Sequence, residues 1–309
     1  MTETIYDVLI IGGGPAGLTA GLYSSRARLK TLLVERMILG GQVMTTTKVE
    51  NYPGFPGGID GPDLMARFQE HCQEFGLETY SGEVTGLADL GAVKEVSVDG
   101  QRFRARSVII TTGAEPRKLG IANEEAFTGR GVSYCATCDG AFFRNVPVAI
   151  AGGGDTAAEE ALFLTRFASK VYLIHRRDRL RATKVLQDRI HAHAKIEPVW
   201  DSVVAEVLGD HSGVTALAVT DPHGANRRTL EVAGLFVAIG VVPKAHFLAG
   251  VLELDAEGYI LTDAECRTSM PGVFAAGDVR KKILKQIATA VGDGAVAAIV
   301  AEKYLDELG

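Results

Sequence analysis

Two cysteines near the middle of the chain, Cys135 and Cys138, are separated by only two residues. Such a pair can form a redox-active disulfide, supply half of a zinc site or remain an inert pair of thiols. A structural zinc site needs four ligands, usually as two close pairs, and the remaining cysteines, Cys72 and Cys266, are isolated in the sequence. Closely spaced thiols can stabilise one thiolate and exchange with the disulfide of a partner. The spacing therefore favours redox chemistry.

Asp139 directly follows the second cysteine. Thiolate chemistry needs a group that accepts and returns a proton, and a carboxylate at this position could do so. The alternative is that Asp139 caps the turn that follows. The candidate catalytic residues are thus Cys135, Cys138 and Asp139, with no metal expected, whereas Cys72 and Cys266 are interpreted as packing residues.

A glycine-rich loop follows the first apolar segment of the chain. Residues 5–11 have the pattern of a buried parallel strand, and Gly12-Gly13-Gly14-Pro15-Ala16-Gly17 leads from them into a helical pattern. Glycines at this spacing allow a tight turn, close approach of a pyrophosphate to backbone N–H groups, and packing of the helix on the strand. The next strand, 31–34, ends on Glu35. Its carboxylate suits the two hydroxyls of an adenosine ribose and repels a 2′-phosphate, which predicts FAD or NAD.

The same pattern recurs later in the chain, with a different ending. Residues 146–151 are strand-like, Gly152-Gly153-Gly154-Asp155-Thr156-Ala157 form the turn, and the strand at 170–174 ends in His175-Arg176-Arg177, with Arg181 shortly after. Guanidinium groups bind phosphate in a bidentate manner, so this cluster predicts the phosphorylated cofactor NADP. The alternative is a solvated basic face. A flavin that accepts hydride from NADPH is the economical combination of the two sites.

The predicted fold is α/β, with two Rossmann-like dinucleotide-binding domains. Gly-x-x-Pro segments at 113–116 and 240–243 close strand-like runs on either side of the second nucleotide unit. We expect the chain to cross between domains there, so that the second domain is inserted into the first. The expected FAD-binding domain comprises residues 1–114 and 246–309, and the expected NADPH-binding domain, which carries the two cysteines, comprises residues 115–245.

The C-terminal part of the chain could complete the first site. Asp278 follows a strand-like run, and a helix is predicted over residues 286–308. A carboxylate there can hold ribitol hydroxyls, and the start of a helix favours negative charge on a reduced flavin. The alternative is an ordinary core helix. Gly292 and Gly294 suggest close backbone packing, although helix flexibility would also explain them.

The bulk composition excludes several classes of function. The 309 residues are 47% hydrophobic and carry a net charge of −6, with basic residues mostly interspersed among acidic ones. Nucleic acid is therefore not an expected partner. No apolar run approaches the roughly 18 residues that a membrane helix needs, and Met1 to Thr4 lead into a strand without a secretory signal. We expect a cytoplasmic protein, where paired cysteines are catalytic or metal-binding more often than structural.

The motifs occur in a fixed order over almost the whole chain: GGGPAGLTAGLY, GGQ at 40–42, TTTKVENYPGF, TGA at 112–114, CATCDG, GGGDTAAEE, HRRDRLRA, FVAIG and GVFAAGDV. Together they resemble the low-molecular-weight bacterial thioredoxin reductases. The resemblance implies a homodimeric FAD enzyme that passes electrons from NADPH through the flavin to Cys135 and Cys138, and on to thioredoxin. It also implies that Cys138 faces the flavin.

Individual positions match the motifs of that family. The expected FAD site comprises Gly12, Gly14, Pro15, Ala16, Gly17, Glu35, Gly41, Gln42, Asn51, Thr112, Gly113, Asp278, Gln286 and Ile287. The expected NADPH site comprises Gly153, Gly154, Asp155, Thr156, His175, Arg176, Arg177 and Arg181. Arg130 and the Phe142-Phe143 pair are similar to the thioredoxin-facing surface, with core packing as the alternative for the two phenylalanines.

The family's domain rotation has a rationale in this chain. The dithiol and the second nucleotide loop belong to the same inserted domain, and the disulfide and the nicotinamide must both reach one flavin. A hinge at the two expected crossings would let them alternate.

Five residues at three places depart from the family pattern. Leu284-Lys285 stands where Tyr-Arg is usual, Lys244-Ala245 replaces Asn-Thr, and Leu180 replaces a common Phe. Lys285 keeps the charge but loses the planar fork.

Other partners define the competing hypotheses. A ferredoxin-type reductase would not need the two cysteines, and a peroxiredoxin-reducing flavoprotein carries an N-terminal extension that this chain is expected to lack. A zinc-stapled nucleotide-binding module is the non-enzymatic alternative.

Overall fold

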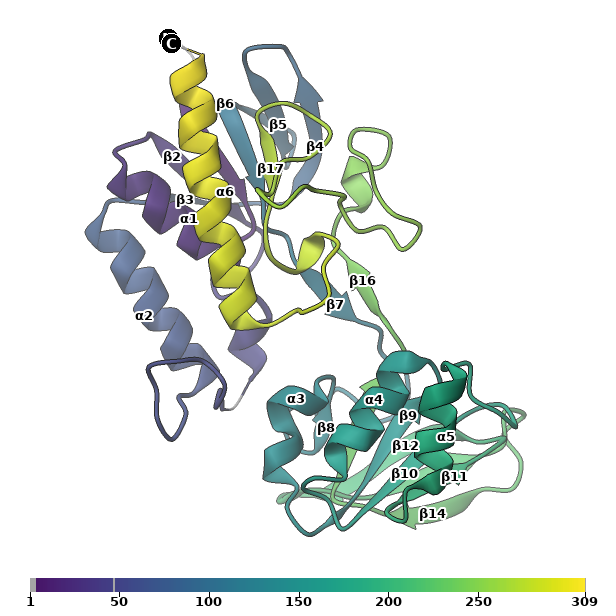
Figure 1. Ribbon diagram of the computed structural model, residues 1–309. Coiled ribbons are helices and arrows are strands. Elements are labelled where there is room, and N and C mark those ends of the chain that lie inside the picture. Colours follow the sequence, from purple (N-terminus) through teal and green to yellow (C-terminus); the bar gives the residue numbers. More distant parts are fainter. Residues whose placement is uncertain (1–3, 47, 309) are drawn as a thin grey trace. The chain divides into compact units, whose positions relative to one another are not determined.

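The computed structural model describes residues 4–46 and 48–308, which form two compact units (Figure 1). Residues 1–115 and 242–309 belong to the first unit, and residues 116–241 to the second. Met1 to Glu3, for which no secretory signal is expected, and Thr47 of the TTTKVENYPGF motif lie outside the described residues.

A seven-stranded sheet organises the first unit, with the order β3-β2-β1-β6-β5-β4 and with β17 paired to β6. Pairing is parallel on both sides of β1, between β2 and β3 and between β17 and β6, and antiparallel among β4, β5 and β6. The strands are β1 (Ile5–Ile11), β2 (Thr31–Glu35), β3 (Glu78–Ser81), β4 (Val84–Asp89), β5 (Lys94–Val98), β6 (Gln101–Ile110) and β17 (Val273–Ala275). Helices complete this unit: α1 (Pro15–Arg26), α2 (Gly61–Glu74), α6 (Ile287–Glu307) and the 3₁₀ turns η1 (Gly41–Thr45), η3 (His246–Leu248) and η4 (Gly277–Val279).

Helices α1 and α6 pack closely because small residues meet where they cross. A Cβ added at Gly294 would lie 2.3 Å from the carbonyl oxygen of Ala16. The expected close packing therefore holds for Gly294. It does not hold for Gly292, where an added Cβ would meet open space.

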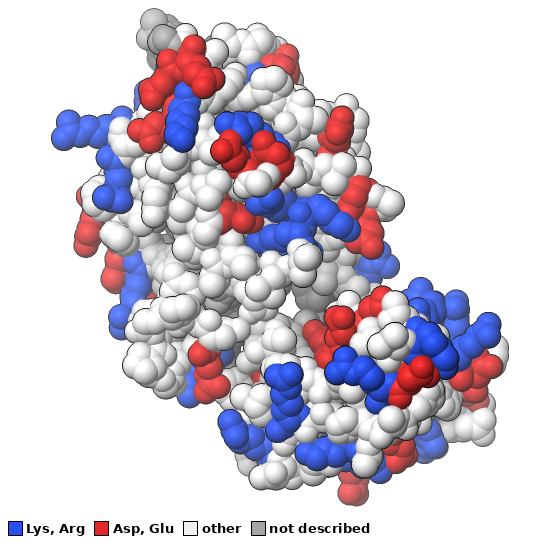
Figure 2. Space-filling view, in the orientation of Figure 1, with Lys and Arg blue, Asp and Glu red and all other residues white. Residues whose placement is uncertain are grey.

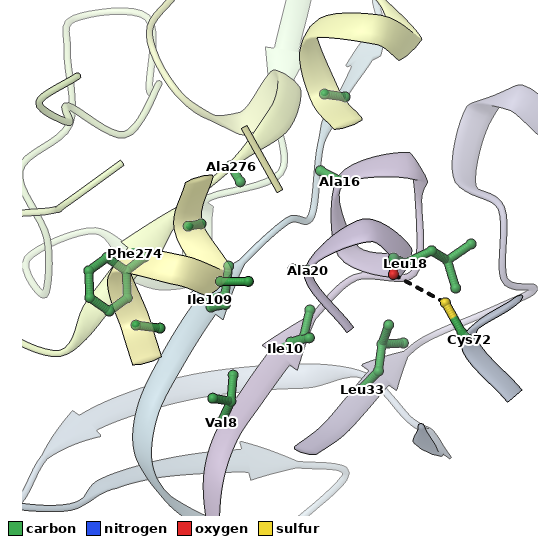
Figure 3. Packing of buried hydrophobic residues seen from close by; sticks show 14 of the residues in the cluster. Val8, Ile10, Ala16, Leu18, Ala20, Leu33, Cys72, Ile109, Phe274 and Ala276 are labelled. Atoms are coloured by element: carbon green, nitrogen blue, oxygen red, sulfur yellow. Dashed lines mark hydrogen bonds between the residues drawn. The ribbon is translucent and has the colours of Figure 1, made fainter. Parts of the chain in front are cut away.

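The core of the first unit lies between these helices and the sheet (Figure 3). Ile10 of β1, Ile109 of β6 and Leu18 of α1 belong to this core, and all three are buried. Each such side chain contributes about 1.5–3 kcal/mol on leaving water. The thiol of Cys72, on α2, is also buried and donates a 3.1 Å hydrogen bond to the Leu18 carbonyl. Burial raises the pKa of Cys72 to about 11, which confirms its interpretation as a packing residue.

A five-stranded parallel sheet with the order β11-β10-β9-β15-β8 organises the second unit. Its strands are β8 (Val132–Ser133), β9 (Pro147–Gly152), β10 (Lys170–Ile174), β11 (Ile196–Val199) and β15 (Gly234–Ala238). The unit also has helices α3 (Ala136–Asp139), α4 (Asp155–Leu164) and α5 (Lys184–Ala192), and the turn η2 (Gly140–Phe142). Three further strands form an antiparallel sheet: β12 (Val203–Asp210), β13 (Gly213–Thr220) and β14 (Arg228–Glu231). These parallel sheets and their helices confirm the predicted α/β fold with Rossmann-like units.

The chain passes between the units through two short strands, β7 (Ala114–Pro116) and β16 (Val241–Pro243), which pair with each other. The Lys244 N–H donates to the Gly113 carbonyl at 2.9 Å, and the Arg117 N–H donates to the Gly240 carbonyl at 2.9 Å. Both strands lie within Gly-x-x-Pro segments.

Basic and acidic side chains are interspersed over the face shown in Figure 2. Among the described helices, none combines the length and the apolar character that crossing a bilayer requires.

Candidate active and cofactor sites

The two cysteines flank the start of the short helix α3 in the second unit. Cys135 precedes the helix and Cys138 lies one turn later, and the two are joined by a disulfide with a Cα–Cα distance of 5.3 Å. The backbone N–H groups of Cys138 and Asp139 donate to the Cys135 carbonyl at 3.2 and 3.1 Å. This single turn therefore brings the sulfurs together, as the spacing in the sequence predicts for a redox disulfide.

Asp139 lies at the end of the same turn and forms a hydrogen bond with Ser133. Its Oδ2 atom accepts a 2.6 Å hydrogen bond from the Ser133 hydroxyl, whose oxygen also accepts the Cys135 N–H at 3.1 Å. Burial raises the pKa of Asp139, and the bond from Ser133 opposes part of that rise. The side chain does not cap η2, the turn that it precedes. A carboxyl that holds its proton to higher pH than usual, on the residue that follows Cys138, suits proton transfer.

Glu160, on α4, is a second acid beside the dithiol that sequence reasoning missed. The Ala136 N–H donates a hydrogen bond to its carboxyl, and burial raises its pKa to about 7. The available signal was an acid beside Ala157 and Ala161 on the apolar face of a predicted helix. No comparable signal in the sequence pointed to Ser133. Its hydrogen bonds to Cys135 and Asp139 depend on the direction in which its side chain points at the end of β8.

The first glycine loop runs between β1 and α1. Gly12 has φ +106°, and a Cβ at Gly17 would lie 1.9 Å from the Gly12 carbonyl, so both positions require glycine for protein packing. Gly14 differs, because its backbone is extended and a Cβ there would meet no atom closer than 4.0 Å. Neither strain nor crowding explains glycine here. A pyrophosphate lying against the backbone at the start of α1 explains it, so the loop fits a dinucleotide.

Residues distant in the sequence surround this loop. Glu35, at the end of β2, accepts the Gly13 N–H at 2.6 Å and the Met37 N–H at 3.0 Å. Gly41 lies against the loop, since a Cβ on it would be 3.1 Å from the Cα of Gly14. Glu35, which is expected to bind the ribose, therefore lies at the loop, and so does Gly41 at the start of η1.

Asp278, in η4, adds a buried carboxyl to this region. The neighbouring Gly277 packs on α1, because an added Cβ would lie 2.9 Å from the Cβ of Ala16. Within the part of the chain that the structure describes, the Oδ1 atom of Asp278 is buried without a hydrogen bond, and the Lys282 ammonium lies 3.8 Å away. Burial raises the pKa of Asp278. A buried oxygen without a hydrogen bond fits the hydroxyl of a bound flavin chain.

The remaining residues of the expected FAD site lie at several places in the first unit. Asn51 and Gln286 meet in a 2.8 Å hydrogen bond, although 235 residues separate them, and Gln286 is the N-cap of α6, which begins at Ile287. The Thr112 hydroxyl is engaged elsewhere, because it donates to the Lys244 carbonyl at 2.7 Å beside Gly113. Pro15 and Ala16 begin α1, whereas Gln42 is an exposed residue of η1.

The second glycine loop runs between β9 and α4 and repeats the pattern of the first. A Cβ at Gly153 would lie 2.1 Å from the ring of His175, whereas a Cβ at Gly154 would meet no atom within 4 Å. His175 is buried below the loop, and burial lowers its pKa, with smaller contributions from neighbouring arginines. The structure therefore makes His175 a support for the loop, and its contact with a nucleotide stays a prediction.

The arginine cluster lies at the end of β10, as predicted. Arg176, Arg177 and Arg181 are exposed, and the Arg181 N–H donates to the Gly153 carbonyl at 2.7 Å, which holds this segment against the loop. Asp155 begins α4 and accepts the Thr183 N–H at 2.6 Å, while Thr156 is exposed. The open position at Gly154 and the exposed guanidinium groups together fit a phosphorylated dinucleotide.

The sequence matches the pyridine nucleotide-disulphide oxidoreductase family over residues 6–294. The chain belongs to this family. Its chemistry implies flavin and nicotinamide cofactors, in agreement with the two loops.

Relatives within the family include bacterial thioredoxin reductases. The chain is 49% identical over 308 residues to the thioredoxin reductase of Listeria innocua, covering 99% of this chain and 96% of the relative. It is 44% identical over 306 residues to that of Bacillus subtilis, with coverage of 99% and 96%. The crystal structure of thioredoxin reductase from Streptococcus pyogenes aligns with a TM-score of 0.95 at 44% identity, covering 99% of this chain and all of that one. The resemblance inferred from the motifs is confirmed.

The departures from the family pattern have local explanations. Lys285 lies over the ring of Tyr259, with its Nζ atom 4.2 Å from the centroid, so its charge forms a cation–π contact. Burial lowers the pKa of Lys285. Leu284 is exposed, Leu180 is buried in the core of the second unit, and Lys244 forms a 3.1 Å ion pair with Glu115.

The residues expected to face thioredoxin are divided by the structure. Phe142 is 44% exposed, whereas Phe143 packs edge-on against Phe236 at 5.2 Å, so core packing is correct for Phe143. Arg130 is exposed and donates to the His211 carbonyl at 2.9 Å. Cys266 is buried and accepts a hydrogen bond from Arg280, which confirms it as a packing residue.

Proposed function

We propose that this member of the family reduces the disulfide of thioredoxin with electrons from NADPH, by way of bound FAD and the Cys135–Cys138 pair. The observation that carries the proposal is the disulfide at the start of α3, beside Asp139 and in the same unit as the second nucleotide loop. The identity with thioredoxin reductases over almost the whole of both chains supports thioredoxin as the substrate. A ferredoxin-type carrier would leave the dithiol without a role, and the relatives' names do not favour a peroxiredoxin-type partner.

The choice of FAD rests on the residues around the first loop. The open position at Gly14 suits a pyrophosphate, Glu35 suits the adenosine ribose, and the Asp278 oxygen that has no hydrogen bond suits the flavin side chain. When bound, FAD supplies a two-electron carrier between a nicotinamide and a disulfide. The choice of NADPH rests on Arg176, Arg177 and Arg181, because exposed guanidinium groups at the end of β10 favour a 2′-phosphate.

The reactions of the dithiol balance in electrons, protons and sulfur–sulfur bonds. Reduction of the Cys135–Cys138 bond takes two electrons and two protons and yields two thiols. One thiolate attacks a sulfur of the thioredoxin disulfide and forms a mixed disulfide, and the other thiolate then displaces it. Thioredoxin leaves with two thiols, and the Cys135–Cys138 bond forms again. Asp139 holds or returns the proton on its carboxyl as the adjacent sulfur gains or loses charge.

The proposal includes an alternation of the dithiol and the nicotinamide at one flavin. Both the disulfide and the second nucleotide loop belong to the unit of residues 116–241, and only β7 and β16 join that unit to the rest of the chain. A rotation about these two strands would exchange the groups presented to the flavin.

Two further features of the proposal concern assembly and location. Val296 and Ile299 are 40% and 39% exposed on α6, an apolar face that supports a homodimer. Cys72 and Cys266 are buried and form no disulfide. Free thiols of this kind support a location in the reducing cytoplasm.

A coupled assay tests the function. Holoenzyme mixed with NADPH and a bacterial thioredoxin should oxidise NADPH and release thioredoxin thiols in equal amounts, and Cys138→Ser should abolish both. The matched control is Cys72→Ser, whose thiol is buried in the other unit. If Cys138→Ser retains the wild-type rate, the proposed dithiol mechanism is wrong.

A further inference from the structure

Glu124 is a buried carboxylate in the second unit with an unusual number of hydrogen bonds. The residue is 2% exposed. Its Oε1 atom accepts the Leu119 N–H at 2.9 Å and the Tyr134 hydroxyl at 2.9 Å, and its Oε2 atom accepts the Gly120 N–H at 2.8 Å. The Ile121 N–H lies 3.5 Å from Oε2. A buried charge is costly unless it is well hydrogen-bonded, and here both oxygens are satisfied.

The groups that Glu124 joins belong to two functionally distinct segments. Leu119 to Ile121 follow closely after β7, where the chain enters this unit. Tyr134 lies between β8 and Cys135, the first redox cysteine. One side chain therefore connects the entry segment of the unit with the residue that precedes the disulfide.

The packing and the protonation of Tyr134 both keep its hydrogen bond to Glu124 in place at physiological pH. Its ring packs against the hydrophobic cluster that contains Val132 and Leu235. Burial raises the pKa of Tyr134 to about 12, and the bond to Glu124 adds to the rise. The hydroxyl thus stays protonated and donates to Glu124. The backbone of Glu124 is held as well, because the Thr128 hydroxyl donates to the Glu124 carbonyl at 3.0 Å.

The backbone of Cys135 is consequently fixed on its N-terminal side by two bonds. Ser133 accepts the Cys135 N–H at 3.1 Å, and Tyr134 is anchored through its hydroxyl. In the reduced state no covalent bond holds the sulfurs together, and these bonds then restrict the backbone motion that closure of the disulfide would otherwise have to remove. A dithiol whose backbone is held in place closes more readily than a loose one, because less freedom is lost on closure.

We propose that the hydrogen bond from Tyr134 to Glu124 is a latch that positions Cys135 for closure of the disulfide, and so makes the dithiol a stronger reductant. The proposal rests on the proposed function, in which closure of this disulfide drives reduction of the partner. Tyr134 and Glu124 are positioning residues, because they act through the backbone of Cys135 and do not touch the reacting sulfurs.

The test is the equilibrium of the holoenzyme dithiol with glutathione. In this exchange one glutathione disulfide and the enzyme dithiol give two glutathione thiols and the enzyme disulfide. Thiol trapping and mass spectrometry over a series of glutathione ratios measure the equilibrium constant. Tyr134→Phe removes only the hydroxyl and should lower the constant for disulfide closure by about three- to tenfold, because the dithiol then gains part of the backbone freedom of one residue, which closure must remove. A tenfold change corresponds to about 30 mV.

Two other variants make the result specific. Tyr80→Phe loses a hydroxyl whose 3.3 Å bond to Gln101 is solvent-exposed, and should leave the constant unchanged. Glu124→Gln keeps an acceptor oxygen but loses its charge, and should lower the constant in the same direction as Tyr134→Phe. The two changes together should cost less than the sum of the two alone.

The latch is overturned if Tyr134→Phe stays within twofold of the wild type, or if Tyr80→Phe has an equal effect. A merely structural role would lower thermal stability without moving the exchange equilibrium measured well below the melting temperature. The glutathione measurement needs neither NADPH nor thioredoxin. If the wild type fails to reduce thioredoxin, the proposed function fails, and the exchange equilibrium still decides the role of the latch.

Discussion

The Ser133 hydroxyl donates a 2.6 Å hydrogen bond to the carboxyl of Asp139, and this bond opposes the rise in the Asp139 pKa that burial causes. Ser133→Ala should therefore raise the pKa of Asp139 further. The limb of the pH–rate profile that reports Asp139 should move to higher pH with thioredoxin as substrate. Asp139→Asn should remove that limb and lower kcat by about 10²-fold, a typical loss for a proton-transfer group. A profile identical to wild type in Ser133→Ala would show that Asp139 does not control the rate.

Glu160 should make the protein less stable as pH rises through the acidic range. Its pKa is raised from 4.5 to about 7 in the folded state, so the folded protein binds more protons than the unfolded chain between these values. Stability is then greatest below pH 4.5 as far as this group is concerned, and falls as pH rises to about 7. Glu160→Gln should remove this dependence and gain of the order of 2 kcal/mol at pH 8. Urea unfolding at several pH values measures the free energy of unfolding of the wild type and the variant. The prediction is contradicted if this free energy changes with pH in the same way in both proteins.

The two glycines at positions 14 and 17 should respond differently to alanine. Gly14→Ala adds a methyl group into open space on an ordinary backbone, so the apoprotein should keep its free energy of unfolding to within about 1 kcal/mol. Its affinity for FAD should fall at least about tenfold, because the methyl group occupies the place of the pyrophosphate. Gly17→Ala creates a contact of 1.9 Å with the Gly12 carbonyl and should destabilise the apoprotein itself. Equal FAD affinity in Gly14→Ala and wild type would exclude a pyrophosphate at this loop.

The arginine cluster should discriminate between the two nicotinamide cofactors. Arg176→Ala combined with Arg177→Ala should raise the KM for NADPH at least about tenfold and change the KM for NADH little, since only NADPH carries the 2′-phosphate. Arg228→Ala, an exposed arginine of β14, is the matched control and should change neither value. Equal increases for both cofactors would contradict the assignment of the phosphate.

The parts of the site that were predictable from the sequence are those coded by neighbouring residues. The two glycine loops, Glu35 and the arginines after β10 follow from local spacing, because a strand, a tight turn and a helix occur in sequence order. Contacts such as Asn51 with Gln286 could be proposed only from the family resemblance, since 235 residues separate them.

The contacts that were missed depend on tertiary packing. Glu124 and Tyr134 belong to no motif, and their bond exists because a turn folds back on the end of β8. The adjacent residues Phe142 and Phe143 could not be told apart, although one is exposed and the other lies against Phe236. His175 continues the strand-end motif but turns its ring under Gly153, a direction that sequence spacing does not determine.

Thiol trapping after anaerobic addition of NADPH shows whether electrons from NADPH reach the Cys135–Cys138 disulfide. Holoenzyme denatured in the presence of an alkylating reagent is digested, and the cysteine peptides are assigned by mass spectrometry. Cys72 and Cys266 serve as internal controls, because they are free thiols before and after NADPH is added. Cys135 and Cys138 should pass together from the disulfide to the alkylated form with one equivalent of NADPH. A disulfide that persists after oxidation of the added NADPH would contradict this prediction.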